Sequence, residues 1–308
     1  MRISVITPVY NGANYIEETV LSVLKAAEGY NVEYLVIDDG STDQTSEILK
    51  KYSHKIKVIQ QINAGESAAV NTGFNNSAGD FILVVSADDP LFTSAIFDGV
   101  VEFFDNNPEV VVWYPNWNMI DQDGHIIKTV RVDEFSLERL LGRFICLPGP
   151  GTFIRKAEAL KIGGRNVRWK YVGDYDFWLR IATLGSLSKR DGVLAQWRFH
   201  NESTSISKRG PEMMREQISV IEEFISTNKL TRRMIRMSRA HSHFQAAITA
   251  VRFNYMLGVK TLIKAFLIGR FLSYEFKFKT IAYHFFTPLS IKVSKSLEKL
   301  LLLNKRKI

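Results

Sequence analysis

The chain has 308 residues, of which 46% are hydrophobic and 12% aromatic, so it can bury one large core or a core with an appended subdomain. Its single cysteine, Cys146, excludes a disulfide framework and a cysteine-rich zinc site and favours a reducing compartment. The first residues, MRISVITPVYNG, lack the pattern of a secretory signal because the apolar run stops at Pro8. We therefore expect a cytoplasmic protein.

The positive charge is concentrated in the last third of the chain. Residues 1–210 contain 22 Lys and Arg against 26 Asp and Glu, whereas residues 211–308 contain 18 against 6, and the net charge is +8. Basic residues interrupt the apolar runs of the tail, so we expect amphipathic helices there and no membrane-spanning helix.

The first ninety residues alternate strand and helix patterns. Short apolar runs predict strands over residues 3–7, 33–37, 57–60 and 81–85. Apolar residues at helical spacing predict helices over residues 15–24, 42–49 and 67–76. This alternation predicts an α/β fold with a mostly parallel sheet and right-handed crossovers.

Polar loops follow three of the predicted strands, at residues 8–11, 38–41 and 86–89. Taken singly, each loop is ordinary turn chemistry of Asn, Asp and Gly. Ligands of such sheets bind beyond the carboxyl ends of the strands, so three polar loops at corresponding positions favour one nucleotide-binding crevice.

Seven segments resemble those of the inverting family 2 glycosyltransferases, which have the GT-A fold. They are VITPVYNGANYIEETVLSVL, EYLVIDDGSTDQT, NAGESAAVNTGF, GDFILVVSADDP, the paired glycines within residues 161–165, GDYDFWLRIATLG and WRFHNESTS, in the order usual for that family. The resemblance implies a GT-A domain over residues 1–210, a Rossmann-like and mostly parallel sheet flanked by helices. Residues 211–308 then form a basic amphipathic helical extension.

The resemblance implies a nucleotide site made of residues from four loops. The implied contacts are Thr7, Pro8, Tyr10, Asp39, Asn63, Gly65 and Asp88. Tyr10 is available to stack on the base, and Asp39 would accept a hydrogen bond from the uracil N–H. A carboxylate at that position favours a UDP-sugar donor.

The segment SADDP resembles the family's metal-binding motif, Asp-x-Asp-Asp, with Ser86 in place of the first Asp. The resemblance implies that Asp88 bonds the ribose hydroxyls and that Asp89 and His200 hold Mg²⁺ or Mn²⁺. The loss of one carboxylate is tolerable because phosphate oxygens and water complete the coordination of such an ion. The alternative is a paired-Asp turn before Pro90.

Asp174, in GDYDFWLR, resembles the family's catalytic base, which removes the proton from the acceptor hydroxyl. Gly173 replaces the Glu that commonly precedes this Asp. Asp176 is the rival candidate, but its place among apolar residues is more typical of a helix-start or packing carboxylate.

The resemblance assigns Gly151, Thr152 and Arg198 to the acceptor or sugar pocket, although the first two also fit a rigid turn. Val70 stands where many members have an Arg that neutralises the diphosphate. The sequence therefore identifies no basic residue that would neutralise the diphosphate of the donor.

The implied function is an inverting transfer of a sugar from a nucleotide donor, with UDP-sugars favoured, to a hydroxyl of a saccharide or lipid-linked acceptor in cell-surface polysaccharide synthesis. Two alternatives stay open: a nucleotide-sugar-binding protein without transferase activity, and another metal-dependent nucleotide-binding transferase. We expect no nucleic-acid partner.

Residues 211–308 lie outside the resemblance and mix apolar residues with Lys and Arg at helical spacing. Such helices bind anionic membrane surfaces, which here would be the inner face of the plasma membrane. The alternative is that they pack on the catalytic domain or form a homo-oligomer, with the basic residues facing solvent.

Overall fold

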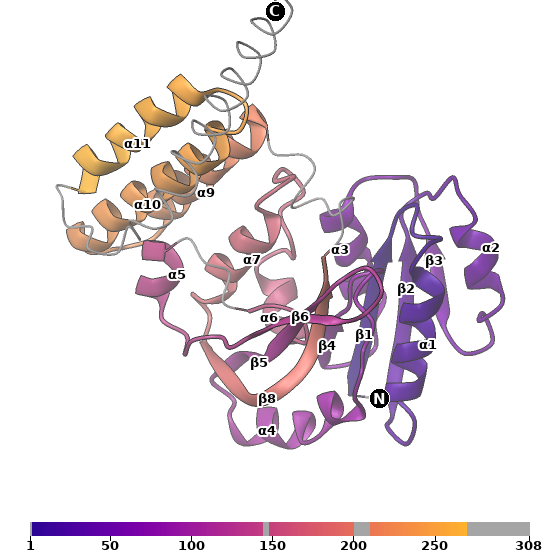
Figure 1. The fold of residues 1–308 in the computed structure, drawn as a ribbon. Coiled ribbons are helices and arrows are strands. Elements are labelled where there is room, and N and C mark those ends of the chain that lie inside the picture. Colours follow the sequence, from indigo (N-terminus) through magenta and orange to yellow (C-terminus); the bar gives the residue numbers. More distant parts are fainter. Residues whose placement is uncertain (1, 144–147, 200–209, 270–308) are drawn as a thin grey trace, which may run out of the picture. The chain divides into compact units, whose positions relative to one another are not determined.

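The computed structural model describes residues 2–143, 148–199 and 210–269 (Figure 1). Cys146 and His200 lie outside these residues. The chain divides into two compact units, one of residues 1–140 and 145–207 and the other of residues 141–144 and 208–308.

The first unit is built on an eight-stranded sheet. Its strands are β1 (Ile3–Val9), β2 (Val32–Asp38), β3 (Lys57–Gln60), β4 (Phe81–Val84), β5 (Val110–Ile120), β6 (Ile126–Val130), β7 (Phe153–Arg155) and β8 (Ser186–Arg198). The order is β3-β2-β1-β4-β7-β5-β6, and β8 pairs with β5. Strands β1 to β4 pair in parallel, β7 is antiparallel to both β4 and β5, β6 is antiparallel to β5, and β8 runs parallel to β5.

The helices of this unit connect the strands. They are α1 (Ile16–Ala26), α2 (Thr45–Lys50), α3 (Glu66–Asn76), the 3₁₀ helix η1 (Ser94–Phe97), α4 (Val100–Asn106), α5 (Leu137–Arg143), α6 (Lys156–Lys161) and α7 (Gly173–Ile181). The last residues of α5 belong to the second unit. The alternation of β1 to β4 with α1 to α3 confirms the α/β fold predicted from the sequence, with element ends that differ by a few residues.

Helices cover both faces of the parallel strands. On one face, α1 contributes Ile16, Val20 and Val23 to a core that also contains Val5 and Val36 from the strands. On the other face Ile6 lies against α3, so close to Gly73 that a Cβ there would be 2.4 Å from the Ile6 Cγ2. These side chains are buried, as expected for a parallel sheet with two covered faces.

The parallel pairing brings the carboxyl ends of β1, β2 and β4 to one edge of the sheet. Hydrogen bonds connect the loops there: the Asn11 amide donates to Ser41 Oγ at 3.0 Å, and the Thr42 amide donates to Asn11 Oδ1 at 2.8 Å. The hydroxyl of Thr19 on α1 donates to the Ala87 carbonyl at 2.8 Å, which fixes the loop after β4. The three polar loops predicted to lie together therefore share this edge.

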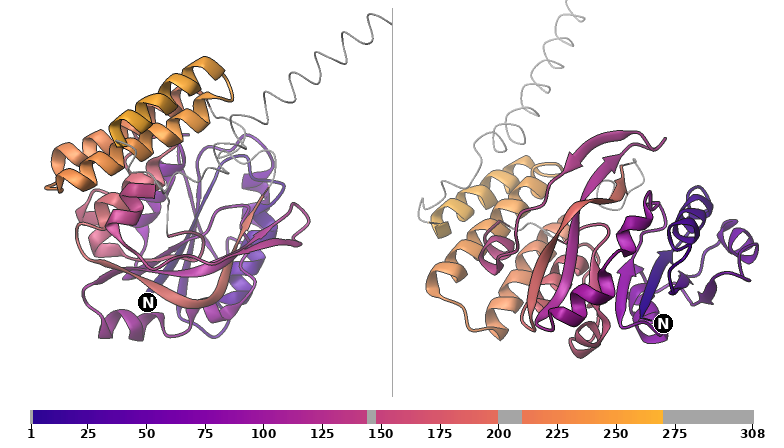
Figure 2. Two further views of the ribbon diagram at one scale, coloured as in Figure 1. Left: turned by 60° about the vertical axis from the view of Figure 1, so that its left-hand side comes forward. Right: turned by 90° about the horizontal axis from the view of Figure 1, so that it is seen from below.

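The second unit contains α9 (Pro211–Thr227), α10 (Arg232–Ala250) and α11 (Tyr255–Gly269), coloured orange to yellow in Figure 1. Helix α10 lies beside both α9 and α11 in the two views of Figure 2. A small core that includes Phe244, Ala247 and Ala265 joins α10 to α11. Within the ranges that the structure describes, no helix is both long enough and apolar enough to cross a membrane.

Candidate active site

Asp39 organises the loop that follows β3. It is 2% exposed, and its Oδ1 accepts hydrogen bonds from the Gln61 side chain at 2.7 Å and the Ala64 amide at 2.9 Å. Its Oδ2 accepts one from the Gly65 amide at 2.8 Å. Because a carboxylate accepts about four hydrogen bonds, these three leave room for one more. Asp39 thus fixes the exposed residues Asn63 and Gly65 and keeps capacity for a ligand N–H.

The end of β1 has one exposed aromatic ring. Thr7 and Pro8 are buried, and the Thr7 hydroxyl lies 3.0 Å from the Tyr34 hydroxyl in the core. Tyr10, by contrast, is 52% exposed at the same edge as Asp39. Of these β1 residues, Tyr10 is the one whose side chain is open to a base.

Asp88 and Asp89 are two adjacent carboxylates that repel each other in the loop after β4. Asp89 is 6% exposed, and Asp88 is half-buried. Burial and then repulsion by Asp88 raise the pKa of Asp89 well above its usual range, an effect that the Arg198 amide and Ser86 partly offset. A divalent cation would relieve this repulsion, and carboxylate oxygens are the ligands that Mg²⁺ and Mn²⁺ prefer. The donor set therefore fits such an ion, whereas His200 lies outside the described residues.

Arg198, at the end of β8, lies among protein acceptors. Its side chain is 2% exposed, and its guanidinium group bonds the Asp88 carbonyl, the Gln122 carbonyl and the Glu18 carboxylate. Its backbone amide donates to Asp89 Oδ1 at 2.8 Å. The structure thus brings Arg198 to the Asp88–Asp89 pair, with most of its hydrogen-bonding capacity used inside the protein.

Gly151 and Thr152 are buried against β5 and β8. Gly151 has φ +79°, and a Cβ there would lie 2.6 Å from the Ala195 Cβ and 3.0 Å from Pro115 Cγ. The Thr152 hydroxyl donates to the Gly149 carbonyl. Both residues fix the path of this segment through packing and a local turn.

Asp174 lies in the first turn of α7 and is exposed. Desolvation by the surrounding protein raises the pKa of its carboxyl group, Arg165 acts in the opposite direction, and Glu66 adds to the increase. Asp176 is 5% exposed and forms an ion pair with Arg180, whose Nη2 lies 2.6 Å from Oδ2. The geometry of Asp176 is that of a packing carboxylate.

Arg165 is a basic residue near Asp174 that the sequence did not single out. Its Nη1 lies 2.7 Å from Glu66 Oε1 at the start of α3, and its side chain is 13% exposed. Val70, which stands where many members of the family have an Arg, is fully buried. A Cβ on Gly173 would lie 2.9 Å from Ser67 Oγ, so the first turns of α3 and α7 approach closely beside Arg165. The only sequence signal for Arg165 is its place directly after two glycines.

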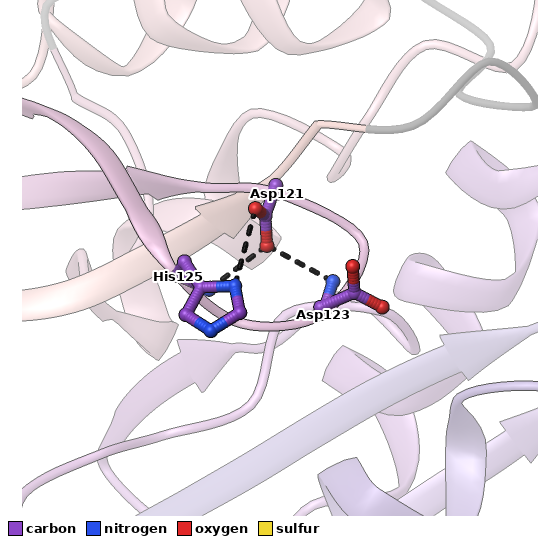
Figure 3. A group of neighbouring side chains, drawn as sticks. All are labelled: Asp121, Asp123 and His125. Carbon is purple, nitrogen blue, oxygen red and sulfur yellow. Dashed lines mark hydrogen bonds and ion pairs between the residues drawn. The ribbon is translucent and has the colours of Figure 1, made fainter.

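A second group of side chains with metal-ligand chemistry lies in the turn between β5 and β6 (Figure 3). Asp121 Oδ1 accepts hydrogen bonds from the amides of Asp123 at 3.0 Å and His125 at 2.8 Å, and the bond from His125 is the main reason that the pKa of Asp121 is lowered. The Asp123 carboxylate points away from the His125 ring. These contacts build the hairpin turn, and we assign no ion to them.

The chain matches the family described as "Glycosyl transferase family 2" over residues 4–162, and it belongs to this family. It is therefore a glycosyltransferase enzyme, as the sequence predicted. An uncharacterised glycosyltransferase of Rickettsia typhi is 31% identical over 261 residues, which cover 82% of this chain and 80% of the relative.

Two solved structures share the fold. The S. aureus TarS fragment 1–349 in complex with UDP-GlcNAc superposes with a TM-score of 0.63 at 21% identity, covering 86% of this chain and 79% of that one. The mannosyltransferase PcManGT of Pyrobaculum calidifontis, in complex with GDP-Man and Mn²⁺, has a TM-score of 0.58 at 14% identity, covering 96% and 80%. These likenesses confirm the GT-A fold class.

Proposed function

We propose that this glycosyltransferase moves a sugar, with inversion, from a UDP-sugar to a hydroxyl of a saccharide or lipid-linked acceptor during cell-surface polysaccharide synthesis. The observation that carries the proposal is the shared edge of the sheet, where Asp39 follows β2 and the charge-repelling pair Asp88–Asp89 follows β4, the two parallel strands on either side of β1. The UDP-GlcNAc complex of the TarS fragment, which has the same fold, supports a UDP-sugar donor.

The nucleotide would bind at this edge. Asp39 has capacity for one more hydrogen bond, which a uracil N–H would supply, and Tyr10 would stack on the base. Asn63 and Gly65 would close over the ribose, and Asp88 would bond its hydroxyls. Thr7 and Pro8 would act as the floor of this pocket, because both are buried.

Asp89 and His200 would hold Mg²⁺ or Mn²⁺, which supplies positive charge to the departing diphosphate. The raised pKa of Asp89 and its repulsion by Asp88 support this assignment. The Mn²⁺ in the PcManGT complex supports the choice of ion.

Asp174 would remove the proton from the acceptor hydroxyl as that oxygen attacks the anomeric carbon opposite the diphosphate. The exposed position of Asp174 leaves it open to an acceptor, and Arg165 favours its ionised form. Gly151 and Thr152 would shape the sugar and acceptor pocket through the turn that they fix.

A transferase assay with UDP-sugars and isothermal titration with UDP, each with and without Mn²⁺, test this proposal. We expect Asp174→Asn to keep UDP binding and to lose about 10²- to 10⁴-fold in turnover, the range typical of a general base. We expect Asp89→Asn to lose Mn²⁺-dependent UDP binding. UDP binding without any sugar transfer would instead favour a nucleotide-sugar-binding protein, and transfer of a nucleotidyl group would favour another metal-dependent transferase.

We further propose that residues 1–210 form the catalytic domain and that residues 211–308 contact an anionic membrane, at the inner face of the plasma membrane. The support is the exposed face of α11, where Met256, Ile263 and Leu267 are 63%, 53% and 68% exposed and alternate with exposed Lys260 and Lys264. No acidic residue occurs between residues 224 and 269. Apolar and cationic side chains on one helix face suit an anionic lipid surface.

Co-sedimentation with vesicles tests the membrane contact. We expect binding to phosphatidylglycerol vesicles, weaker binding to phosphatidylcholine vesicles, and a loss of binding when Ile263 and Leu267 are both changed to Ser. The matched control changes the exposed pair Ile126 and Ile127 of β6 to Ser and should bind as the unchanged chain does. A stable dimer that ignores vesicles would favour the homo-oligomer alternative.

A further inference from the structure

We infer that Arg198 and Glu18 form a positioning pair that holds Asp88 and Asp89 in the arrangement needed for the metal and the nucleotide. The inference rests on the metal-dependent function proposed above. It assigns to this pair a structural part in donor binding, with no direct contact to the sugar.

Arg198 donates hydrogen bonds to both Asp88 and Asp89. The Arg198 amide donates to Asp89 Oδ1 at 2.8 Å, and its Nε donates to the Asp88 carbonyl at 2.9 Å. One bond orients the Asp89 side chain and the other fixes the backbone directly before it. The Asp89 side chain is therefore held from β8, and Ser86 adds a hydrogen bond from the same loop.

The far side of the guanidinium group is anchored by α1. Nη2 of Arg198 donates to both oxygens of Glu18, at 2.8 and 2.7 Å, and Nη1 donates to the Gln122 carbonyl at 2.6 Å. The guanidinium carbon lies 5.2 Å from the centre of the Tyr15 ring. With three of its five N–H groups engaged, Arg198 has at most two left for a ligand.

Electrostatics explain why such an anchor is needed. Asp88 and Asp89 are adjacent carboxylates and Asp89 is 6% exposed, so their repulsion favours movement of the Asp89 side chain away from Asp88. Ser86 replaces the first carboxylate of the family's motif, so fewer carboxylates are available beside Asp89 to bind a cation. Carboxylates that bind metals are commonly oriented by hydrogen bonds from residues behind them.

Glu18 completes the pair because a buried guanidinium group needs a compensating charge. The Glu18 side chain is 54% exposed, whereas Arg198 is 2% exposed. Glu18 is therefore accessible to a conservative substitution that leaves the core unchanged. Its neighbour Glu17 bonds Lys51 and Tyr52 instead, which makes it a matched control on the same helix turn.

The test is isothermal titration of UDP into the full chain, once with Mn²⁺ and once with EDTA, for Glu18→Gln, Arg198→Lys and the control Glu17→Gln. We expect the first two variants to bind UDP about 10- to 100-fold more weakly with Mn²⁺, as do other enzymes that lose a residue behind a metal ligand. In EDTA their affinity should equal that of the unchanged chain, and Glu17→Gln should match the unchanged chain in both.

Three results would overturn the inference. Equal weakening with and without Mn²⁺ would mean general damage to the fold, which a melting curve would also report. Normal Mn²⁺-dependent binding in Glu18→Gln and Arg198→Lys, together with its loss in Asp89→Asn, would remove the positioning role and leave the proposed metal site intact. UDP binding by the unchanged chain that ignores Mn²⁺ would remove the metal site and the positioning role together.

Discussion

The side-chain amide of Asn71 makes two hydrogen bonds with the backbone of Arg165: Nδ2 donates to the carbonyl and Oδ1 accepts from the amide, each at 2.7 Å. The bonds join α3 to a segment 94 residues further along the chain. Gly164 has φ +69°, and a Cβ there would lie 2.2 Å from Asn71 Oδ1. The paired glycines thus allow the close approach that places Arg165 beside Glu66.

Removal of the Asn71 side chain should destabilise the protein. We expect Asn71→Ala to lower the free energy of unfolding by about 1–3 kcal/mol, because two backbone groups of Arg165 lose their partners. The control is Asn76→Ala on the same helix, an exposed residue whose side chain donates to the Thr72 carbonyl four residues earlier, and we expect a change within about 0.5 kcal/mol. Urea denaturation measures both, and equal losses would contradict the role given to Asn71.

Gly151→Ala should be more damaging than Gly124→Ala. Both glycines have positive φ, +79° and +88°, so each substitution costs about 1–2 kcal/mol of backbone strain. A Cβ at Gly151 also meets the Ala195 Cβ at 2.6 Å, whereas one at Gly124 meets nothing within 4 Å. We expect this overpacking to add about 1–3 kcal/mol. Thermal melting of the two variants gives the difference, and identical melting temperatures would argue against tight packing of this segment.

Asp174→Asn and Asp176→Asn should differ in what they impair. Asp176→Asn breaks a mostly buried ion pair with Arg180, so we expect a loss of about 1–3 kcal/mol in the free energy of unfolding. Asp174→Asn should keep stability and lose turnover. Urea denaturation and the turnover number, corrected for the folded fraction, separate the two effects. Near-normal turnover in folded Asp174→Asn would reject Asp174 as the base.

The rise of kcat/KM with pH on the acidic side should depend on the charged groups around Asp174. A base must be ionised, so activity rises as the pH increases through its pKa, and desolvation of Asp174 moves this rise to higher pH. Arg165→Gln removes a charge that lowers the pKa of Asp174 and should move the rise further upward. Glu66→Gln removes a charge that raises it and should move the rise downward.

The measurement is kcat/KM of sugar transfer against pH for the unchanged chain and these two variants. An exposed ion pair such as Arg2 with Asp105 supplies the control, because Asp105→Asn should leave the profile unchanged. Profiles that coincide for all the proteins would show that another group governs the acidic side.

The sequence alone predicted the strands and helices of the first ninety residues. Strands β1 to β4 and helices α1 to α3 appear where apolar runs and helical spacing placed them, because these patterns depend on which faces of each element are buried. The shared edge of the three polar loops also followed, since parallel strands bring their carboxyl ends together. The helices over residues 211–269 were predicted in the same way.

The tertiary structure decided what each polar side chain contacts. The assignment of Arg198 to the acceptor or sugar pocket stays a prediction, and its hydrogen-bond partners Asp89 and Glu18 are 109 and 180 residues away in the chain. Sequence reasoning gave no role to Arg165, whose position depends on Asn71 of another helix. Local patterns determine where a strand or helix forms, because they reflect burial of the nearest residues. Hydrogen bonds between distant segments arise only when the whole sheet is packed, so only the tertiary structure determined them.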